Sequence, residues 1–209
     1  MMNNIEAQDE IDRISAELIS MSHTKPVIAV AIAGAPGSGK STFAEMLSTT
    51  VGAACCVVPM DGFHLDNTIL QERGLMHVKG APQTFDREGF GVLVDSLCSQ
   101  TTPFYPTFDR EADCVIENGG KVPVNASILL FEGNYLLFDA PGWSTLAQKW
   151  DASIWLEVSE DILEARLIQR WRDHGMSEDA AKTRARMNDM ANAELVIRHA
   201  LPAKWTVSL

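Results

Sequence analysis

The feature that most constrains this chain is a run of apolar residues that leads directly into a glycine-rich turn. Residues 27–33 read Val-Ile-Ala-Val-Ala-Ile-Ala, apolar at every position, which is typical of a parallel strand covered by helices on both faces. The residues that follow match the pattern G-x-x-x-x-G-K-[ST]. They are Gly34, Ala35, Pro36, Gly37, Ser38, Gly39, Lys40 and Ser41. A helix from Lys40 to about Thr50 is expected next. The sequence therefore predicts a strand, a turn that can bind phosphate at the start of a helix, and that helix.

Each required residue of this turn has a chemical task. The glycines let backbone N–H groups converge on phosphate oxygens, Lys40 can reach the β- and γ-phosphates, and Ser41 offers a hydroxyl to Mg²⁺. Thr42 follows at the start of the helix, and we include it among the expected nucleotide contacts. The sequence therefore predicts a nucleotide site.

Strands and helices alternate along the rest of the chain. Ile11, Ile14, Leu18 and Met21 recur at helical spacing, which predicts an N-terminal helix within residues 1–24. Further strands are expected at 55–60, 127–131 and 153–158, and helices at 66–73 and 87–98. Ser159 and Ser177 are each followed by two acidic residues, so each can cap another helix. The alternation predicts a single α/β domain over 1–209, a three-layer fold with a mostly parallel sheet and helices on both faces.

Two segments depart from this alternation. Residues 74–84 form a glycine-rich loop. Asn118-Gly119-Gly120 lies between the extended segments 113–117 and 121–124, and such a sequence is typical of a hairpin turn. We therefore expect a small hairpin with its turn at 118–120.

The charge and the cysteines limit the classes of partner and compartment. Seventeen basic against 28 acidic residues give a net charge of −11, which argues against nucleic acid and anionic membranes as partners. No apolar run approaches the roughly 20 residues of a membrane helix, and residues 1–13 lack the apolar core of a secretory signal. The four cysteines show no C-x-x-C spacing. A reduced, cytoplasmic protein is expected.

Two carboxylates follow predicted strands. Asp61 comes after Val57-Val58-Pro59-Met60, and Glu132 after Leu129-Leu130-Phe131. Ligands of open α/β sheets bind at the carboxyl ends of strands, where a carboxylate can hold Mg²⁺ or accept a proton from a hydroxyl. Each acid alone could instead be a solvated loop residue or a helix cap. Together with the glycine-rich turn, they favour a functional role.

Four spaced motifs carry a resemblance to a known family. They are residues 34–41, Met60-Asp61-Gly62-Phe63-His64, Lys79-Gly80-Ala81-Pro82-Gln83-Thr84-Phe85-Asp86 and Leu130-Phe131-Glu132-Gly133-Asn134-Tyr135. From about Pro26 to its end, the chain resembles the P-loop kinases that include uridine kinase, phosphoribulokinase and bacterial pantothenate kinase. Within them it looks most like bacterial proteins named as fructose transport system kinases.

This resemblance implies an enzyme that uses ATP and Mg²⁺ to phosphorylate a hydroxyl of a small molecule. Lys40 and Ser41 would serve the phosphates and the metal, Asp61 would be the base for the acceptor hydroxyl, and Glu132 would lie in the metal shell. Gly62 stands where uridine kinase and phosphoribulokinase carry serine, which argues against nucleosides and ribulose phosphate as acceptors.

A cluster of basic residues is expected to form a lid. Six of the seventeen cations lie between residues 166 and 186: Arg166, Arg170, Arg172, Lys182, Arg184 and Arg186. In the family this region closes over the nucleotide, so we expect Arg166 and Arg170 to contact phosphate and Arg170 to be catalytic. The alternative is a solvated helix face paired with Glu164, Asp173 or Glu178. The sequence leaves open whether Arg172, Asn188 and Asn192 contact nucleotide, and whether Trp171 touches adenine.

The acceptor pocket is expected between the second strand and the hairpin. Its candidate residues are Asp61, His64, Lys79, Asp86, Tyr105 and Arg110. Asp86 could instead only cap the helix that follows it.

The resemblance implies a sugar-like metabolite as the acceptor, with fructose as one candidate. A nucleoside, a pantothenate-like compound and a nucleoside monophosphate are alternatives. An ATP-binding regulatory or assembly protein with slow hydrolysis is an alternative of another class. The identity of the acceptor, the nucleotide preference and the choice between monomer and homodimer stay open.

Overall fold

A parallel sheet of five strands forms the centre of the protein, which a computed structural model describes from residue 4 to residue 209. The strands run β2-β5-β1-β6-β7 across the sheet, every neighbouring pair parallel. Their bounds are β1 (Ile28–Gly34), β2 (Cys55–Pro59), β5 (Ile128–Gly133), β6 (Ala152–Glu157) and β7 (Trp205–Ser208). This confirms the predicted α/β class. The sequence did not predict β7, because four residues with two buried side chains are too short a signal.

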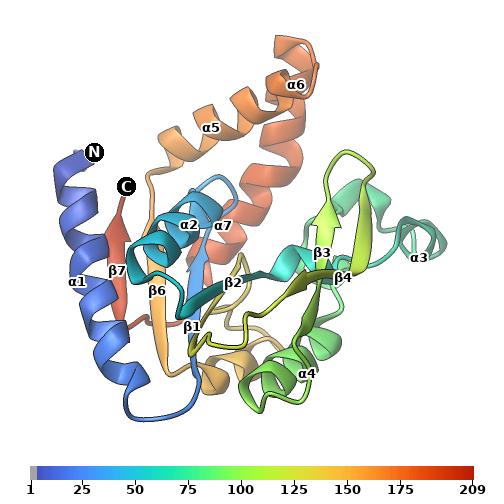
Figure 1. Cartoon of the computed structure of the whole chain (residues 1–209). Helices are drawn as coiled ribbons and strands as arrows, with labels where there is room; N and C mark the ends of the chain where they lie inside the picture. The colour runs from blue at the N-terminus through green and yellow to red at the C-terminus, as the bar shows by residue number, and fades with distance from the viewer. Residues whose placement is uncertain (1–3) are drawn as a thin grey trace.

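Helices cover both faces of the sheet because the strands are apolar on both. From β1, Ile28, Val30 and Ile32 pack into the cluster that contains α1 (Asn4–Ser22) and α2 (Lys40–Val51). The alternate residues Ala29 and Ala31 face the cluster of α4 (Arg87–Cys98), the 3₁₀ helix η4 (Ser144–Lys149) and α7 (Met190–Arg198). In Figure 1, α2 lies in front of the sheet and α7 behind it. Residues 1–3 of the predicted N-terminal helix lie outside the described residues.

Two helices project from the carboxyl end of the sheet (Figure 1, top). They are α5 (Glu160–Asp173) and α6 (Glu178–Arg184), and α6 continues through a π-helical turn, η5 (Ala185–Asp189), into α7. Ser177 caps α6 by accepting a bond from the Ala180 N–H at 3.4 Å, whereas Ser159 takes the cap position of α5 without a side-chain bond. Helical periodicity alone did not predict the π turn.

The predicted hairpin exists, but the predicted position of its turn is wrong. Strands β3 (Phe104–Asp109) and β4 (Cys114–Lys121) are antiparallel, so the chain turns at 110–113 and residues 118–120 lie inside β4. The Asp109 carboxylate accepts bonds from two N–H groups of this turn. The glycines of β4 serve packing: a Cβ at Gly120 would lie 2.1 Å from the Tyr105 ring, and one at Gly119 would lie 1.9 Å from Thr107 Oγ1.

Short elements connect the sheet to the hairpin. These are the 3₁₀ turn η1 (Met60–Phe63), the helix α3 (Asn67–Glu72) and the 3₁₀ turns η2 (Met76–Val78) and η3 (Pro82–Thr84). Asp66 caps α3 by accepting a bond from the Thr68 N–H at 2.8 Å. Within residues 4–209, no helix combines the length and apolar character needed to cross a bilayer.

Candidate active site

The carboxyl ends of β1, β2 and β5 meet at one edge of the sheet. Ala33 pairs with Gly133, and Pro59 pairs with Glu132. The sheet register therefore places the glycine-rich turn after β1, Asp61 after β2 and Glu132 on β5 side by side. A cavity of about 620 Å³ opens at this edge, and Lys40, Ser41, Asp61 and Glu132 all line it.

The glycine-rich turn has a conformation that depends on its glycines. Gly37 and Gly39 have φ of +82° and +88°, and a Cβ at Gly34 would lie 2.7 Å from Ser38 Oγ. The Lys40 side chain, 8% exposed, folds back and donates to the carbonyls of Gly34 at 3.1 Å and Ala35 at 2.9 Å. Burial lowers the pKa of Lys40 to about 8. A cation is thus held at the place where phosphate is expected.

Ser41 and Glu132 form the candidate metal pair. Ser41 Oγ donates to Glu132 Oε1 at 3.1 Å, and burial, with the neighbouring Asp61 charge, raises the pKa of Glu132. Among the described residues, no three His, Cys, Asp or Glu side chains gather as a metal site. Mg²⁺ usually binds through one or two protein oxygens, water and substrate phosphates. The pair fits that mode of binding.

Asp61 makes an ion pair with the hairpin. Arg110 Nη2 donates to Asp61 Oδ2 at 2.6 Å, and both side chains line the cavity. Asp61 lies in η1, whereas Arg110 lies in the turn after β3. The hairpin can come this close because residue 62 is glycine, where a Cβ would lie only 2.2 Å from the Pro106 carbonyl oxygen.

His64 lies between two aromatic rings at the hairpin side of the cavity. Its ring centroid is 4.1 Å from that of Phe85 and 4.8 Å from that of Phe108. Burial lowers the pKa of His64 to about 4, so the ring is neutral near pH 7. Nδ1 is buried, and no residue of the described range 4–209 hydrogen-bonds to it. His64 therefore gives this side of the cavity a neutral, largely aromatic wall.

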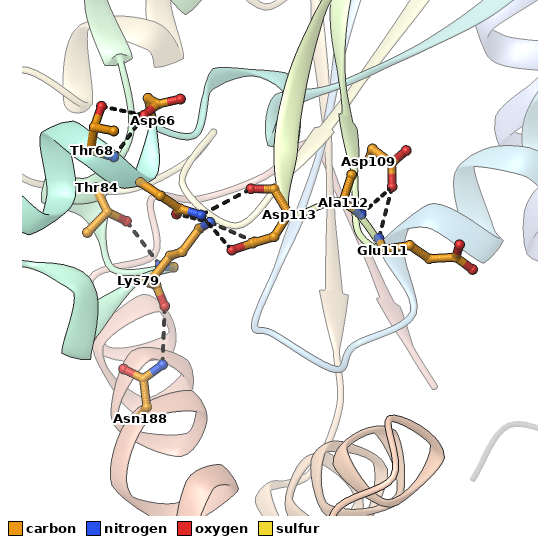
Figure 2. A network of polar contacts seen from close by, with 11 residues as sticks. Asp66, Thr68, Lys79, Thr84, Asp109, Glu111, Ala112, Asp113 and Asn188 are labelled. Carbon is orange, nitrogen blue, oxygen red and sulfur yellow. Dashed lines mark hydrogen bonds and ion pairs between the residues drawn. The ribbon is translucent and has the colours of Figure 1, made fainter.

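Lys79 is held by two residues from different segments. Its ammonium donates to Asp113 Oδ1 at 2.7 Å and to Asn67 Oδ1 at 2.6 Å, and it lies 5.1 Å from the centroid of the Phe108 ring. Figure 2 shows the Asp113 carboxylate turned toward this ammonium. The candidates Asp61, His64, Lys79 and Arg110 are thus brought together in one cavity.

The structure does not bring Asp86 and Tyr105 to that cavity. The Asp86 carboxylate accepts a bond from the Gly89 N–H at 2.9 Å and caps α4, as the alternative interpretation expected. The Tyr105 hydroxyl lies 3.8 Å from Cys56 Sγ. Asp86 thus serves as a helix cap, and Tyr105 packs against the hydrophobic core.

Five of the six basic residues of the lid divide into two groups. Arg170 lines the cavity, and Arg166 donates to the Gly37 carbonyl of the glycine-rich turn at 3.3 Å. The other group behaves as a solvated face: Lys182 pairs with Glu178, Arg186 with Glu164, and Arg172 donates to Gln169.

Several cavity residues were missed or left open by the sequence, among them Arg184, Asn134, Asp113 and Trp171. Arg184 lines the cavity, although its place within the basic run gave a signal. Asn134 also lines it and belongs to the Glu132-Gly133-Asn134 motif, whereas Asp113 gave no signal because the segment was interpreted as a strand. Trp171 lines the cavity too, with its ring under Arg170 and Arg184.

The chain is similar to known kinases in both sequence and structure. No protein-family model matches it. A presumed uridine kinase of Schizosaccharomyces pombe is 33% identical over 208 residues, covering 92% of this chain and 86% of its own length. A pantothenate kinase of Klebsiella pneumoniae is 31% identical over 157 residues, 68% of this chain and 49% of the relative. The crystal structure of a presumed fructose transport system kinase from Silicibacter sp. TM1040 is 47% identical and superposes with a TM-score of 0.89, covering 94% of this chain and 98% of its own.

Proposed function

Because the chain belongs to the P-loop kinase family to which uridine and pantothenate kinases belong, we propose that it uses Mg²⁺ and ATP to phosphorylate a hydroxyl of a sugar-like small molecule. Fructose is one candidate. The observation that carries this proposal is the shared cavity, in which Lys40, the Ser41–Glu132 pair and Asp61 meet at one sheet edge. Phosphoryl transfer requires mainly in-line positioning and neutralisation of charge, and these groups are of the kinds that supply both.

Each residue has a proposed part in the transfer. Lys40 and Arg170 bind the β- and γ-phosphates, and Arg166 keeps the lid against the glycine-rich turn. Ser41 and Glu132 hold Mg²⁺, which when bound neutralises phosphate charge. Asp61 accepts the proton of the acceptor hydroxyl: Arg110 bonds to Oδ2, so Oδ1 can serve the acceptor.

The charges at the hairpin side favour an uncharged acceptor. Lys79 is paired with Asp113 and Arg110 with Asp61, while His64 is neutral near pH 7. An acidic acceptor such as a pantothenate-like compound, or a nucleoside monophosphate, would compete with these ion pairs for its counter-charge. A polyol carries no charge that would disturb these ion pairs, and it can place its C–H face against Phe85 and Phe108, which line the cavity. The four free cysteines are in keeping with a reducing cytoplasm, where we place the reaction.

An ATP-consumption screen tests the proposal. The panel contains fructose and other sugars, nucleosides and pantothenate, and each is compared with the water-only rate. We expect at least one sugar to raise ATP consumption. Asp61→Asn should then lower kcat by about 10²–10⁴-fold, the usual contribution of a general base, with ATP affinity unchanged. Asp95→Asn, on the exposed side of α4, is the matched control and should leave kcat unchanged.

Two outcomes would contradict the kinase. One is a panel in which no member exceeds the water-only rate. The other is an Asp61→Asn enzyme that turns over its acceptor at the wild-type rate. If Asp61→Asn preserves ATP binding and a slow hydrolysis that no acceptor stimulates, the regulatory alternative is favoured.

A further inference from the structure

The π-helical turn η5 carries two buried polar side chains that the proposed reaction does not use. It is wound one residue wider than an α-helix, because the Met190 N–H bonds to the Ala185 carbonyl. π turns are rare and are frequent at functional sites. Asn188 and Asp189, consecutive in this turn, are only 7% and 8% exposed. Buried polar groups destabilise a fold unless they are hydrogen-bonded, so their partners indicate their role.

Asn188 bonds to the acceptor side of the cavity. Its Nδ2 donates to the Lys79 carbonyl oxygen at 3.2 Å, and Figure 2 shows it reaching from its helix to the loop above. The side chain of the same Lys79 is held by Asp113 and Asn67. The next residue, Gly80, accepts a bond from the Tyr135 hydroxyl at 2.6 Å. Asn188 therefore fixes the backbone of the loop that presents Lys79.

Asp189 bonds to the opposite side, the lid. The Trp171 indole N–H donates to Asp189 Oδ2 at 2.5 Å. The Trp171 ring lies close to two cations that line the cavity, with the guanidinium carbons of Arg170 and Arg184 at 5.4 and 5.1 Å from its centroid. Burial lowers the pKa of Arg170, and the Asp189 charge opposes this by stabilising the cation. Asp189 therefore holds the aromatic and cationic surface of the lid.

We propose that Asn188 and Asp189 are positioning residues that link the lid, through the π turn, to the loop that presents Lys79 (residues 76–84, the acceptor loop). The inference rests on the proposed function, because it assumes that the lid closes on a nucleotide. A movement of the lid is transmitted to the π turn by the hydrogen bond between Trp171 and Asp189. It is transmitted from the π turn to the acceptor loop by the hydrogen bond between Asn188 and the Lys79 carbonyl. Nucleotide binding thereby orders the acceptor loop before transfer.

Hydrogen–deuterium exchange of the full chain tests this without an identified acceptor. In the wild type, Mg²⁺ with the non-hydrolysable ATP analogue AMP-PNP should slow exchange in α5 and also in loop 76–84. Asn188→Ala should keep the protection of α5 and lose that of the loop. Asp189→Ala should weaken AMP-PNP binding by about tenfold, a moderate coupling between sites. Asp189→Asn, which keeps an oxygen for the indole N–H, should recover part of that loss.

Met187→Ala is the matched control, because Met187 lies in the same turn with its side chain 78% exposed. It should behave as the wild type in both segments. Loop protection that survives in Asn188→Ala, or is lost equally in Met187→Ala, would overturn the inference while leaving the kinase proposal intact. AMP-PNP that fails to bind the wild type would overturn both. If AMP-PNP protects loop 76–84 as expected but the ATP-consumption screen finds no acceptor, only the kinase proposal is overturned.

Discussion

The glycine-rich turn is formed by eight consecutive residues, whereas the proposed acceptor pocket is assembled from side chains of segments that lie far apart in the chain. On the nucleotide side, Lys40 bonds to carbonyls five and six residues before it. On the acceptor side, Asp61 bonds to Arg110, 49 residues away, and Lys79 to Asp113, 34 residues away. We infer that the glycine-rich turn tolerates changes elsewhere in the fold, whereas the proposed acceptor pocket depends on the position of the hairpin.

Lys40→Met should impair only the nucleotide side of the cavity, and its effect on binding should be the largest in this comparison. Loss of a buried charge from a charged contact usually costs 2–5 kcal/mol, so AMP-PNP affinity should fall by about 30-fold or more. Isothermal titration measures the affinity, and exchange protection of the hairpin should stay at the wild-type level. Lys25→Met, which removes a surface ion pair with Asp151, is the control. An affinity within about threefold of the wild type, below 1 kcal/mol, would contradict the role of Lys40.

Gly62→Ala should damage the acceptor half instead. The new Cβ would lie 2.2 Å from the backbone oxygen of Pro106, so the hairpin must move away and carry Arg110 from Asp61. We expect a loss of about 1–3 kcal/mol in the free energy of unfolding, as for other overpacked sites. Denaturant titration measures this loss, and AMP-PNP affinity should be unchanged.

Gly91→Ala is a close control for that variant. Gly91 is also buried, but the nearest atom to its added Cβ is 3.6 Å away, so the helix should be unchanged or slightly more stable. Equal stability of the two variants would show that the contact between Gly62 and Pro106 does not position the hairpin.

The same division explains what the sequence could predict. The positions of Lys40, Asp61 and Glu132 follow from strand ends, because carboxyl ends of neighbouring parallel strands share an edge. The position of Asp113 does not, because Asn118-Gly119-Gly120 has the composition of a turn and the glycines are required by Tyr105 and Thr107 across the hairpin. The roles of Asn188 and Asp189 depend on a π turn, which an α-helical pattern does not distinguish. Side-chain partners distant in sequence were thus the part that could not be predicted.

Nucleotide affinity should depend on pH through Lys40. The pKa of its ammonium is about 8 without nucleotide, and bound phosphate favours the charged form and so raises it. Affinity should be constant below pH 8 and fall by up to about tenfold per pH unit above it. Titrations of AMP-PNP from pH 7 to 9.5 measure this fall. Lys40→Arg stays charged throughout, so an equal fall in that variant would assign the effect to another group.

Asp86→Ala should give the smallest effect. It distinguishes a structural role of Asp86, as the cap of α4, from a role in binding the acceptor. Loss of the cap of α4 should cost about 1 kcal/mol of stability, with the KM for the acceptor unchanged. Asp86→Ser, which can also cap, should restore most of the stability. If both variants raise the KM, Asp86 binds the acceptor.

The hairpin pairs only with itself: within residues 4–209, β3 and β4 form a sheet separate from the five strands. The hairpin contacts the rest of the fold through side chains, such as Arg110 with Asp61, and through the close approach of the Pro106 carbonyl to Gly62. We infer that substitutions at these contacts can shift the hairpin and leave the glycine-rich turn unchanged. On the proposed function, an acceptor site built in this way can change while the site for ATP stays the same.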